Sequence, residues 1–428
     1  MSRNQIWFTL FMLLLLIAPQ IPIEIPGGIA RSNVSLGLVG LVLWFFANPK
    51  KIFSFPRIDA FHPLFWIIIF AIYAFVVSLL SGSIVSIAYA VQFLAYAVFG
   101  TVLLRRYAKN LMSTNRCDID SIFFGIAVVY SIGMLVSLFT GPIYPHQTIW
   151  TARPVGGSYI QQGVGFSEGQ NMAGIVVVFF TTACIFMYQG ISWKRWILLC
   201  LLLLALLSTL SRSAVISFLL ALIFVCCLDN LPSVVRRASI KVSVLRNIVL
   251  VMSALGFSAA AVILGIYCVN KSLLLGILSF FDVAGKDGLM ASHMTDRFSL
   301  WWWGLNNWAS GSLLQMIFGG GFRSSMGVTS NGAWKTAHNV YITILGDFGV
   351  VGLTLFLAAL FAALLRYIHL FLTDKVGRVE RFGLMAVLAL SIHNLTGPYF
   401  YSPVCLSLLI FTLAVTSCPV DQKNQLLC

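Results

Sequence analysis

The chain has 428 residues, of which 59% are hydrophobic and only 9% are charged, and its mean hydropathy is +0.94. In soluble domains roughly half of the residues are apolar and about a quarter are charged, so this composition excludes an ordinary soluble domain and predicts a polytopic membrane protein. The net charge of +14 does not indicate a nucleic-acid partner, because the cations are spread over short loops between apolar runs.

Apolar runs recur along the whole chain and predict about twelve transmembrane helices, since a helix needs about 20 residues to cross the hydrocarbon core. The runs cover residues 5–23, 33–47, 62–81, 84–104, 120–140, 171–189, 196–210, 213–228, 247–268, 349–365, 382–396 and 403–417. No small-residue cleavage site follows the first run, so we interpret it as an uncleaved span. We therefore expect an all-α polytopic integral membrane protein with a single domain, residues 1–428.

The positive charges predict the orientation of these spans. Nineteen of the 27 Lys and Arg residues lie at the termini or in alternate short loops. By the positive-inside rule this side is cytoplasmic, with both termini inside. The other eight cations lie in outward-facing segments: Arg31, Arg153, Arg212, Lys271, Lys286, Arg297, Arg323 and Lys335.

Two outward-facing loops are long, whereas the cytoplasmic loops are short. The smaller covers residues 141–170 and contains Arg153, and the larger covers residues 269–348. Loops held by a rigid scaffold commonly carry binding and catalytic residues. We therefore expect the chemistry to face outward, and we treat residues 269–348 as the main catalytic loop.

Arg212 lies in a short polar joint, Ser208-Thr-Leu-Ser-Arg-Ser213, between two apolar runs. An arginine at the edge of a membrane either extends to the lipid phosphates or turns inward to bind a ligand. The neighbouring hydroxyl side chains favour the inward position, because they can bind a guanidinium or a substrate and are not needed for anchoring.

Arg297 precedes a segment whose aromatic residues, including Trp301, recur at helical spacing. This pattern predicts a short amphipathic helix in the membrane interface, where tryptophan is often only an anchor. An arginine beside the N-terminus of such a helix would suit a phosphate group. The Gly319-Gly-Gly-Phe-Arg323 segment that follows has backbone amides that could approach an oxyanion, but it lacks the Lys-Ser/Thr of a nucleotide-binding loop and does not indicate nucleotide binding.

His338 is the strongest candidate for a catalytic base in the large loop. It is followed by Asn339, and Asp347 lies nine residues further along the chain. A histidine can accept a hydroxyl proton near neutral pH. Asp347 could orient the imidazole, or it could only cap a helix that begins near Gly349; the spacing leaves both interpretations open.

The sequence predicts neither a metal site nor a cofactor. The nine cysteines show no ligand spacing, and the outward-facing segments contain no cluster of acids suited to a divalent ion. Six acids lie on that side against eight cations. We expect the cations themselves to neutralise any leaving phosphate.

Together these motifs resemble the O-antigen ligase and O-antigen polymerase superfamily. The resemblance covers roughly residues 165–400 and depends on Ser211-Arg-Ser213, Asp296-Arg297 with Trp301, Gly320-Gly-Phe322 and, most specifically, His338-Asn339 before Gly349-x-x-Gly352. The layout of twelve spans with a large outer loop containing short helices is also similar, and it implies a GT-C-like fold.

The resemblance implies a metal-independent, inverting glycosyltransferase at the periplasmic face of the inner membrane of a Gram-negative bacterium. Such an enzyme transfers a glycan from undecaprenyl diphosphate to lipid A–core, if it is a ligase, or to a lipid-linked glycan, if it is a polymerase. Arg212 and Arg297 would then bind the diphosphate, and His338 would activate the acceptor hydroxyl. Arg153, Arg323, Asn339, Asp347 and Trp301 are expected substrate contacts.

The resemblance favours a ligase narrowly, because of the His338 element. A polymerase of O-antigen, capsule or exopolysaccharide stays open, and it would bring a chain-length regulator as a further partner besides the membrane lipids. A flippase or other transporter is a remote alternative. Transporters show repeat symmetry and polar or broken positions in mid-span, whereas here the polar residues gather in the outer loops.

Overall fold

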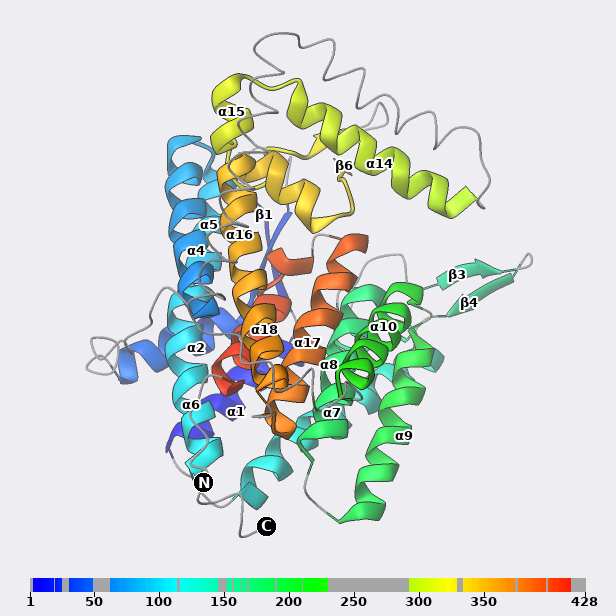
Figure 1. The fold of residues 1–428 in the computed structure, drawn as a ribbon. Coiled ribbons are helices and arrows are strands. Elements are labelled where there is room, and N and C mark those ends of the chain that lie inside the picture. Colours follow the sequence, from blue (N-terminus) through cyan, green and yellow to red (C-terminus); the bar gives the residue numbers. More distant parts are fainter. Residues whose placement is uncertain are drawn as a thin grey trace.

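The computed structural model describes residues 3–18, 20–24, 31–48, 62–113, 116–144, 152–155, 158–161, 163–167, 169–188, 191–209, 211–229, 292–328, 334–373, 376–397 and 399–416. These residues are largely helical (Figure 1). The helical character predicted from the apolar runs is therefore confirmed. The predicted run 247–268 lies outside the described residues.

The helices follow the chain in this order: α1 (Arg3–Leu16), α2 (Leu36–Ala47), α4 (Pro63–Leu80), α5 (Ile84–Ala95), the π-helical turn η1 (Tyr96–Gly100), α6 (Thr101–Ser113), α7 (Arg116–Thr140), α8 (Gln170–Phe186), α9 (Ser192–Ser208), α10 (Arg212–Asp229), α14 (Ser292–Ala309), α15 (Leu313–Phe318), α16 (Val340–Leu372), α17 (Arg378–His393), the 3-10 turns η2 (Asn394–Thr396) and η3 (Tyr399–Tyr401), and α18 (Pro403–Thr416).

In the part of the chain that the structure describes, three short antiparallel hairpins, which the sequence did not predict, lie between the helices. They pair β1 (Gln20–Glu24) with β2 (Arg31–Ser35), β3 (Ala152–Val155) with β4 (Ser158–Gln161), and β5 (Gly327–Val328) with β6 (Trp334–Lys335). The first predicted span was therefore too long at its C-terminal end. Prolines 19 and 22 disfavour a continued helix, and the chain forms a strand from Gln20.

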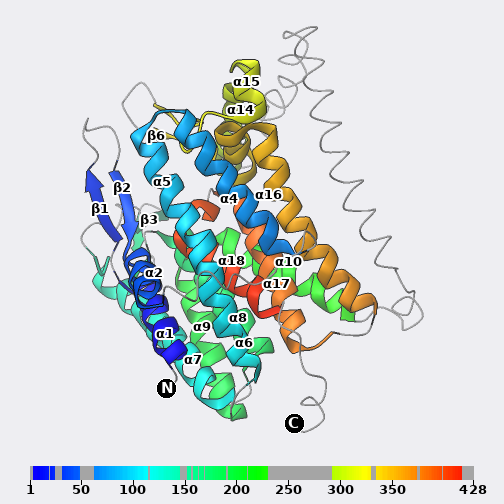
Figure 2. The same cartoon turned by 90° about the vertical axis from the view of Figure 1, so that its left-hand side faces the viewer.

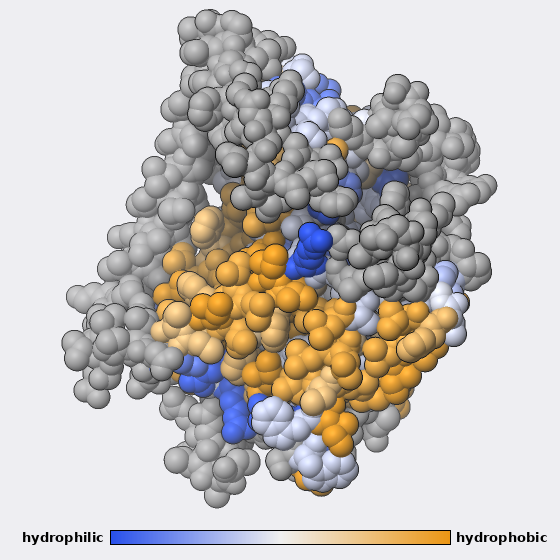
Figure 3. Space-filling view, turned by 90° about the vertical axis from the view of Figure 1, so that its right-hand side faces the viewer, coloured by the Kyte–Doolittle hydropathy of each residue, from blue (hydrophilic) through white to orange (hydrophobic). Residues whose placement is uncertain are grey.

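Five helical segments of the described chain are long and apolar enough to cross a membrane: Pro63–Leu80, Ile84–Tyr107, Phe123–Thr140, Arg212–Asp229 and Val340–Phe371. Other apolar helices are shorter, such as Leu36–Ala47 and Gln170–Phe186. In a space-filling view, apolar side chains form a broad band with hydrophilic residues above and below it (Figure 3). These features are compatible with a membrane-embedded protein.

Helix α16 packs against α4 and α17, and α17 in turn contacts α8, α10 and α18. Near the N-terminal end of α17, Arg381 forms an ion pair with Asp229 of α10, with 3.0 Å between Nε and Oδ2. Helices α14 and α15 lie at one end of this bundle, and α1 begins at the opposite end (Figures 1 and 2). The bundle therefore presents the N-terminal ends of α8, α10 and α16 and the C-terminal end of α17 as candidates for the site.

Helix α16 begins nine residues before the predicted start at Gly349, and Gly349 interrupts it with φ 65° and ψ −169°. The backbone of Gly349 lies against that of α15, since a Cβ at this position would be 2.2 Å from the Ile317 carbonyl oxygen. The Tyr73 hydroxyl links α15 to α16, because it donates to the carbonyls of Phe318 (2.8 Å) and Phe348 (3.1 Å). The break therefore sets how the outer helices sit on the bundle.

Substitution of Gly349 by alanine is expected to destabilise the protein, because only glycine adopts this backbone conformation readily and a Cβ would clash with backbone. The expected cost is about 2–4 kcal/mol, combining backbone strain with the clash. Thermal unfolding in detergent measures it. Gly125→Ala in α7, where a Cβ would meet nothing within 4 Å, is the matched control, and equal melting temperatures for both variants would contradict this account of the break.

Candidate functional site

Arg297 connects the outer helix α14 to the end of the bundle. Its guanidinium donates a hydrogen bond to the carbonyl oxygen of Thr396 in η2. The predicted amphipathic helix is confirmed, but it begins at Ser292. Arg297 is thus the sixth residue of α14, so the expectation that it lies beside the N-terminus of this helix was wrong. What the structure shows for this arginine is its contact with η2.

The first turns of α8 and α10 lie together. Ser211 donates a hydrogen bond of 2.7 Å to the Asn171 side-chain oxygen, and Gly174 lets the helices approach, since a Cβ there would lie 2.7 Å from that of Ala214. Arg212 is the first residue of α10 and is exposed. No hydrogen bond or ion pair joins it to a described residue, so its guanidinium is available to a ligand.

The end of α17 completes this cluster. The Thr396 hydroxyl donates to the His393 carbonyl (2.7 Å), and the His393 ring lies near the backbone carbonyls of Asn171 and Ser213. These contacts link Arg297, through Thr396 and His393, to the residue next to Arg212. Residues that lie far apart in the sequence therefore meet at one end of the bundle.

His338 lies just before α16 and has a positive φ of 48°. A non-glycine residue in this region is strained, and such residues cluster at functional sites. The side chain is exposed, and Arg297 lies close enough to act on it electrostatically. Partial removal from water and the charge of Arg297 both lower the pKa of His338 from its ordinary value. The neutral imidazole, which can accept a proton, therefore predominates at neutral pH.

The lowered pKa predicts how His338 responds to pH. Because its folded pKa lies below 6.5, the neutral ring persists as the pH falls to that value and is lost only at still lower pH. Replacing Arg297 by glutamine removes a cation and should shift this loss to higher pH, whereas Arg297→Lys should shift it less. The rate at which diethyl pyrocarbonate modifies His338, followed by mass spectrometry across pH, measures this. An unshifted profile in Arg297→Gln would contradict the electrostatic contact.

Asn339 has a structural task. It is buried, and its side-chain oxygen accepts hydrogen bonds from the backbone amides of Tyr341 (2.9 Å) and Ile342 (3.3 Å). It is the N-cap of α16, which explains why the helix begins here. The cap fixes the residue before it, so Asn339 acts on the site by holding His338 in place.

Asp347 lies away from His338 and fastens the triglycine turn. Its fully buried carboxylate accepts hydrogen bonds from the amides of Arg323 (3.0 Å) and Ser325 (2.7 Å), and its carbonyl accepts from Gly320 and Gly321. The sequence had left open whether Asp347 orients the imidazole or caps a helix near Gly349. Among the described residues it does neither and instead holds the turn against the break in α16, out of reach of a substrate.

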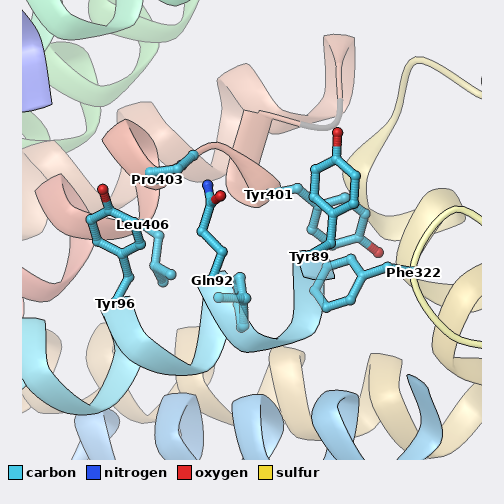
Figure 4. A pocket seen from close by; sticks show the side chains of 8 residues that line it. Tyr89, Gln92, Tyr96, Phe322, Tyr401, Pro403 and Leu406 are labelled. Atoms are coloured by element: carbon cyan, nitrogen blue, oxygen red, sulfur yellow. The ribbon is translucent and has the colours of Figure 1, made fainter. Parts of the chain in front are cut away.

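Arg323 points toward α5 and away from the Arg297 cluster. Its guanidinium lies 4.3 Å from the centre of the Tyr89 ring, a cation–π contact. Tyr89 also lines a small pocket between α5 and α18, together with Phe322 and Tyr401 at the same end of it (Figure 4). Arg323, like His338, has a positive φ, 66°. The structure therefore separates Arg323 from the other candidate cations.

The remaining candidates contribute less. Trp301, one turn after Arg297, is partly buried, and its Nε1 atom has no hydrogen-bond partner in the described part of the chain. Arg153 lies in β3, but its side chain lies outside the described residues.

Sequence reasoning missed His393, Tyr399 and Asn171 as members of the cluster. The available signal was a second His-Asn pair, His393-Asn394, in a polar stretch after an apolar run. A lone histidine in such a run is usually structural, so the pair alone could not be separated from packing. Only the convergence of α8, α10 and α17 shows its neighbours.

Among the described residues, no group of three or more His, Cys, Asp or Glu side chains is arranged to hold a metal ion. No known protein-family model matches the chain, and no curated protein matches it. The contacts of Arg297 therefore carry the functional information in this chain.

Proposed function

We propose that this protein is a metal-independent, inverting glycosyltransferase that moves a glycan from undecaprenyl diphosphate to an acceptor sugar. One observation carries the proposal. Arg297 bridges from α14 to η2 within electrostatic reach of His338, and α10 begins with the exposed Arg212. Two cations and a histidine that could serve as a general base thus lie at one end of an apolar bundle, which would suit an anionic lipid-linked substrate.

In the proposed reaction, His338 accepts the proton of the acceptor hydroxyl while the hydroxyl oxygen attacks the anomeric carbon. The bond between that carbon and the diphosphate oxygen breaks, and its electron pair stays on the leaving diphosphate. Arg212 and Arg297 bind this diphosphate and stabilise the charge that develops on it. Attack from the face opposite the leaving group inverts the anomeric configuration.

The proposal includes a location and a topology. The protein would lie in the inner membrane of a Gram-negative bacterium with about twelve spans and both termini in the cytoplasm. The Arg297 cluster would then face the periplasm, because nineteen of the 27 Lys and Arg residues fall on the other side. Lipid-linked glycan, glycan acceptor and membrane lipids are the proposed partners.

Within this class we narrowly favour an O-antigen ligase that delivers the glycan to lipid A–core, with a polymerase of lipid-linked repeats as the second candidate. The surface polysaccharide of a deletion strain separates them on a gel. A single-repeat band indicates a polymerase, and long chains left on the lipid carrier indicate a ligase. An unchanged polysaccharide would contradict both. Transfer by the purified protein should also survive treatment with a chelator, and loss of activity would overturn the metal-independent mechanism.

A further inference from the structure

His393, the last residue of α17, differs from the other described histidines with an unpaired buried nitrogen in that both of its ring nitrogens are affected. It is only 1% exposed, yet neither ring nitrogen has a hydrogen-bond partner within the described residues. The carbonyls of Ser213 and Asn171 lie near the ring without meeting the geometry of a hydrogen bond. The ring stacks on Tyr399, with 4.7 Å between the centroids.

Burying two unpaired ring nitrogens costs stability unless a ligand forms hydrogen bonds with them. A buried polar group without a partner destabilises a protein by about 1–3 kcal/mol, and nearly all such groups in native proteins are paired. A neutral imidazole has one donor and one acceptor nitrogen. His62, by contrast, caps α4, since its Nδ1 atom accepts a hydrogen bond from the Leu64 amide. His393 performs no such capping, so packing alone does not explain an imidazole here.

The surroundings of His393 favour an anion. Helices α8 and α10 both begin beside it, and no side chain caps the first turn of α8. Helix N-termini present free amides and a partial positive charge. Arg212 opens α10 on one side, and Arg297 reaches Thr396, three residues beyond His393, on the other. Arg297 acts on the ring electrostatically, and Arg212 immediately precedes Ser213, whose carbonyl lies near the ring.

A second unsatisfied group lies at the same helix end. The side-chain oxygen of Gln170, the first residue of α8, is buried without a hydrogen-bond partner in the described chain. The next residue, Asn171, bonds Ser211 across the junction with α10. Two unsatisfied buried groups at one junction indicate a place built to receive a polar ligand.

We propose that His393 is a further ligand-binding residue, which donates a hydrogen bond from its ring to the diphosphate held between Arg212 and Arg297. The proposal rests on the proposed function for the identity of the ligand. The diphosphate would enter at the first turns of α8 and α10, and Arg297 would exchange its bond to the Thr396 carbonyl for one to a phosphate oxygen. His393 takes no proton from the acceptor, because it is enclosed below the cluster, whereas His338 is exposed.

The test is the affinity of the detergent-purified full chain for farnesyl diphosphate, measured by intrinsic tryptophan fluorescence with farnesol as the uncharged control. His393→Phe keeps the ring stacked on Tyr399 but removes both nitrogens, and it should weaken binding about tenfold or more, as expected for a lost hydrogen bond to a charged group. His393→Gln restores a donor and should recover part of the affinity. His369→Phe, at the far end of α16, is the matched control and should bind like the wild type.

The outcomes separate this inference from the proposed function. If the wild type binds farnesyl diphosphate and Arg297→Gln weakens the binding, but His393→Phe binds normally, the role of His393 is wrong and the proposed function stands. If His393→Phe and His369→Phe weaken binding equally, the effect is one of packing and the inference also fails. If the wild type binds farnesol as well as it binds farnesyl diphosphate, the diphosphate donor of the proposed function is wrong.

Discussion

Replacing His338 by glutamine is expected to abolish most of the glycan transfer and to leave donor binding intact. Glutamine is similar in length and polar, but it cannot accept the acceptor's proton. The loss of a general base typically costs about 10²–10⁴ in rate. Since the His338 side chain is exposed, the variant should fold normally. Single-turnover transfer in membranes measures the effect.

His369→Gln supplies the control for this experiment, because it changes the same residue type near the opposite end of α16. It should transfer glycan at the wild-type rate. Transfer by His338→Gln at a rate within a few-fold of the control would show that the base lies elsewhere. A loss of donor affinity in step with the loss of rate would instead place His338 in the donor site.

Replacing Arg297 by glutamine is expected to impair both donor binding and transfer. In the proposed reaction the guanidinium leaves the Thr396 carbonyl and binds the diphosphate, where charge increases as the sugar–oxygen bond breaks. Removing one such preorganised donor costs about 10²–10³ in rate. Arg297→Lys keeps the charge but loses the forked pair of donors, so it should recover only part of the activity. Donor affinity and single-turnover rate should be measured together.

Arg381→Gln is the matched control for Arg297→Gln. Arg297 contacts the turn that follows the C-terminal end of α17, whereas Arg381 lies near the N-terminal end of the same helix. Its ion pair with Asp229 is partly exposed, and a pair of this kind contributes about 0–1 kcal/mol to stability. It should leave transfer almost unchanged. If Arg297→Gln and Arg381→Gln reduced transfer equally, the effect would be one of general charge, and Arg297 would have no specific place in the site.

Much of the fold follows from the sequence because apolar runs of about 20 residues are long enough to cross a membrane as helices. Their ends follow less well. The sequence placed a helix start at Gly349, yet the Asn339 cap starts α16 earlier and the helix breaks at Gly349. The break depends on contacts with α15 and with Tyr73. Tyr73 lies far from this segment in the sequence, yet its hydroxyl bonds the Phe348 carbonyl. Local pattern carries no information about such a contact.

The site was predictable in its residues but less so in their roles. The sequence singled out Arg297 and His338, and they lie within electrostatic reach of each other. Asp347 was a candidate for orienting the histidine, because nine residues of spacing could not show that its carboxylate binds the backbone of Arg323 and Ser325. His393 was missed, because the unsatisfied state of its nitrogens exists only in three dimensions.

The measurement that tests the central claim most directly is glycan transfer by the purified protein in lipid nanodiscs. The substrates are a glycan on undecaprenyl diphosphate and separate samples of lipid A–core and of a second lipid-linked glycan. The account predicts a glycosylated acceptor and an equal amount of released undecaprenyl diphosphate, with an inverted anomeric linkage and no requirement for metal. Failure to transfer to either acceptor, by protein that binds the lipid-linked donor, would contradict it.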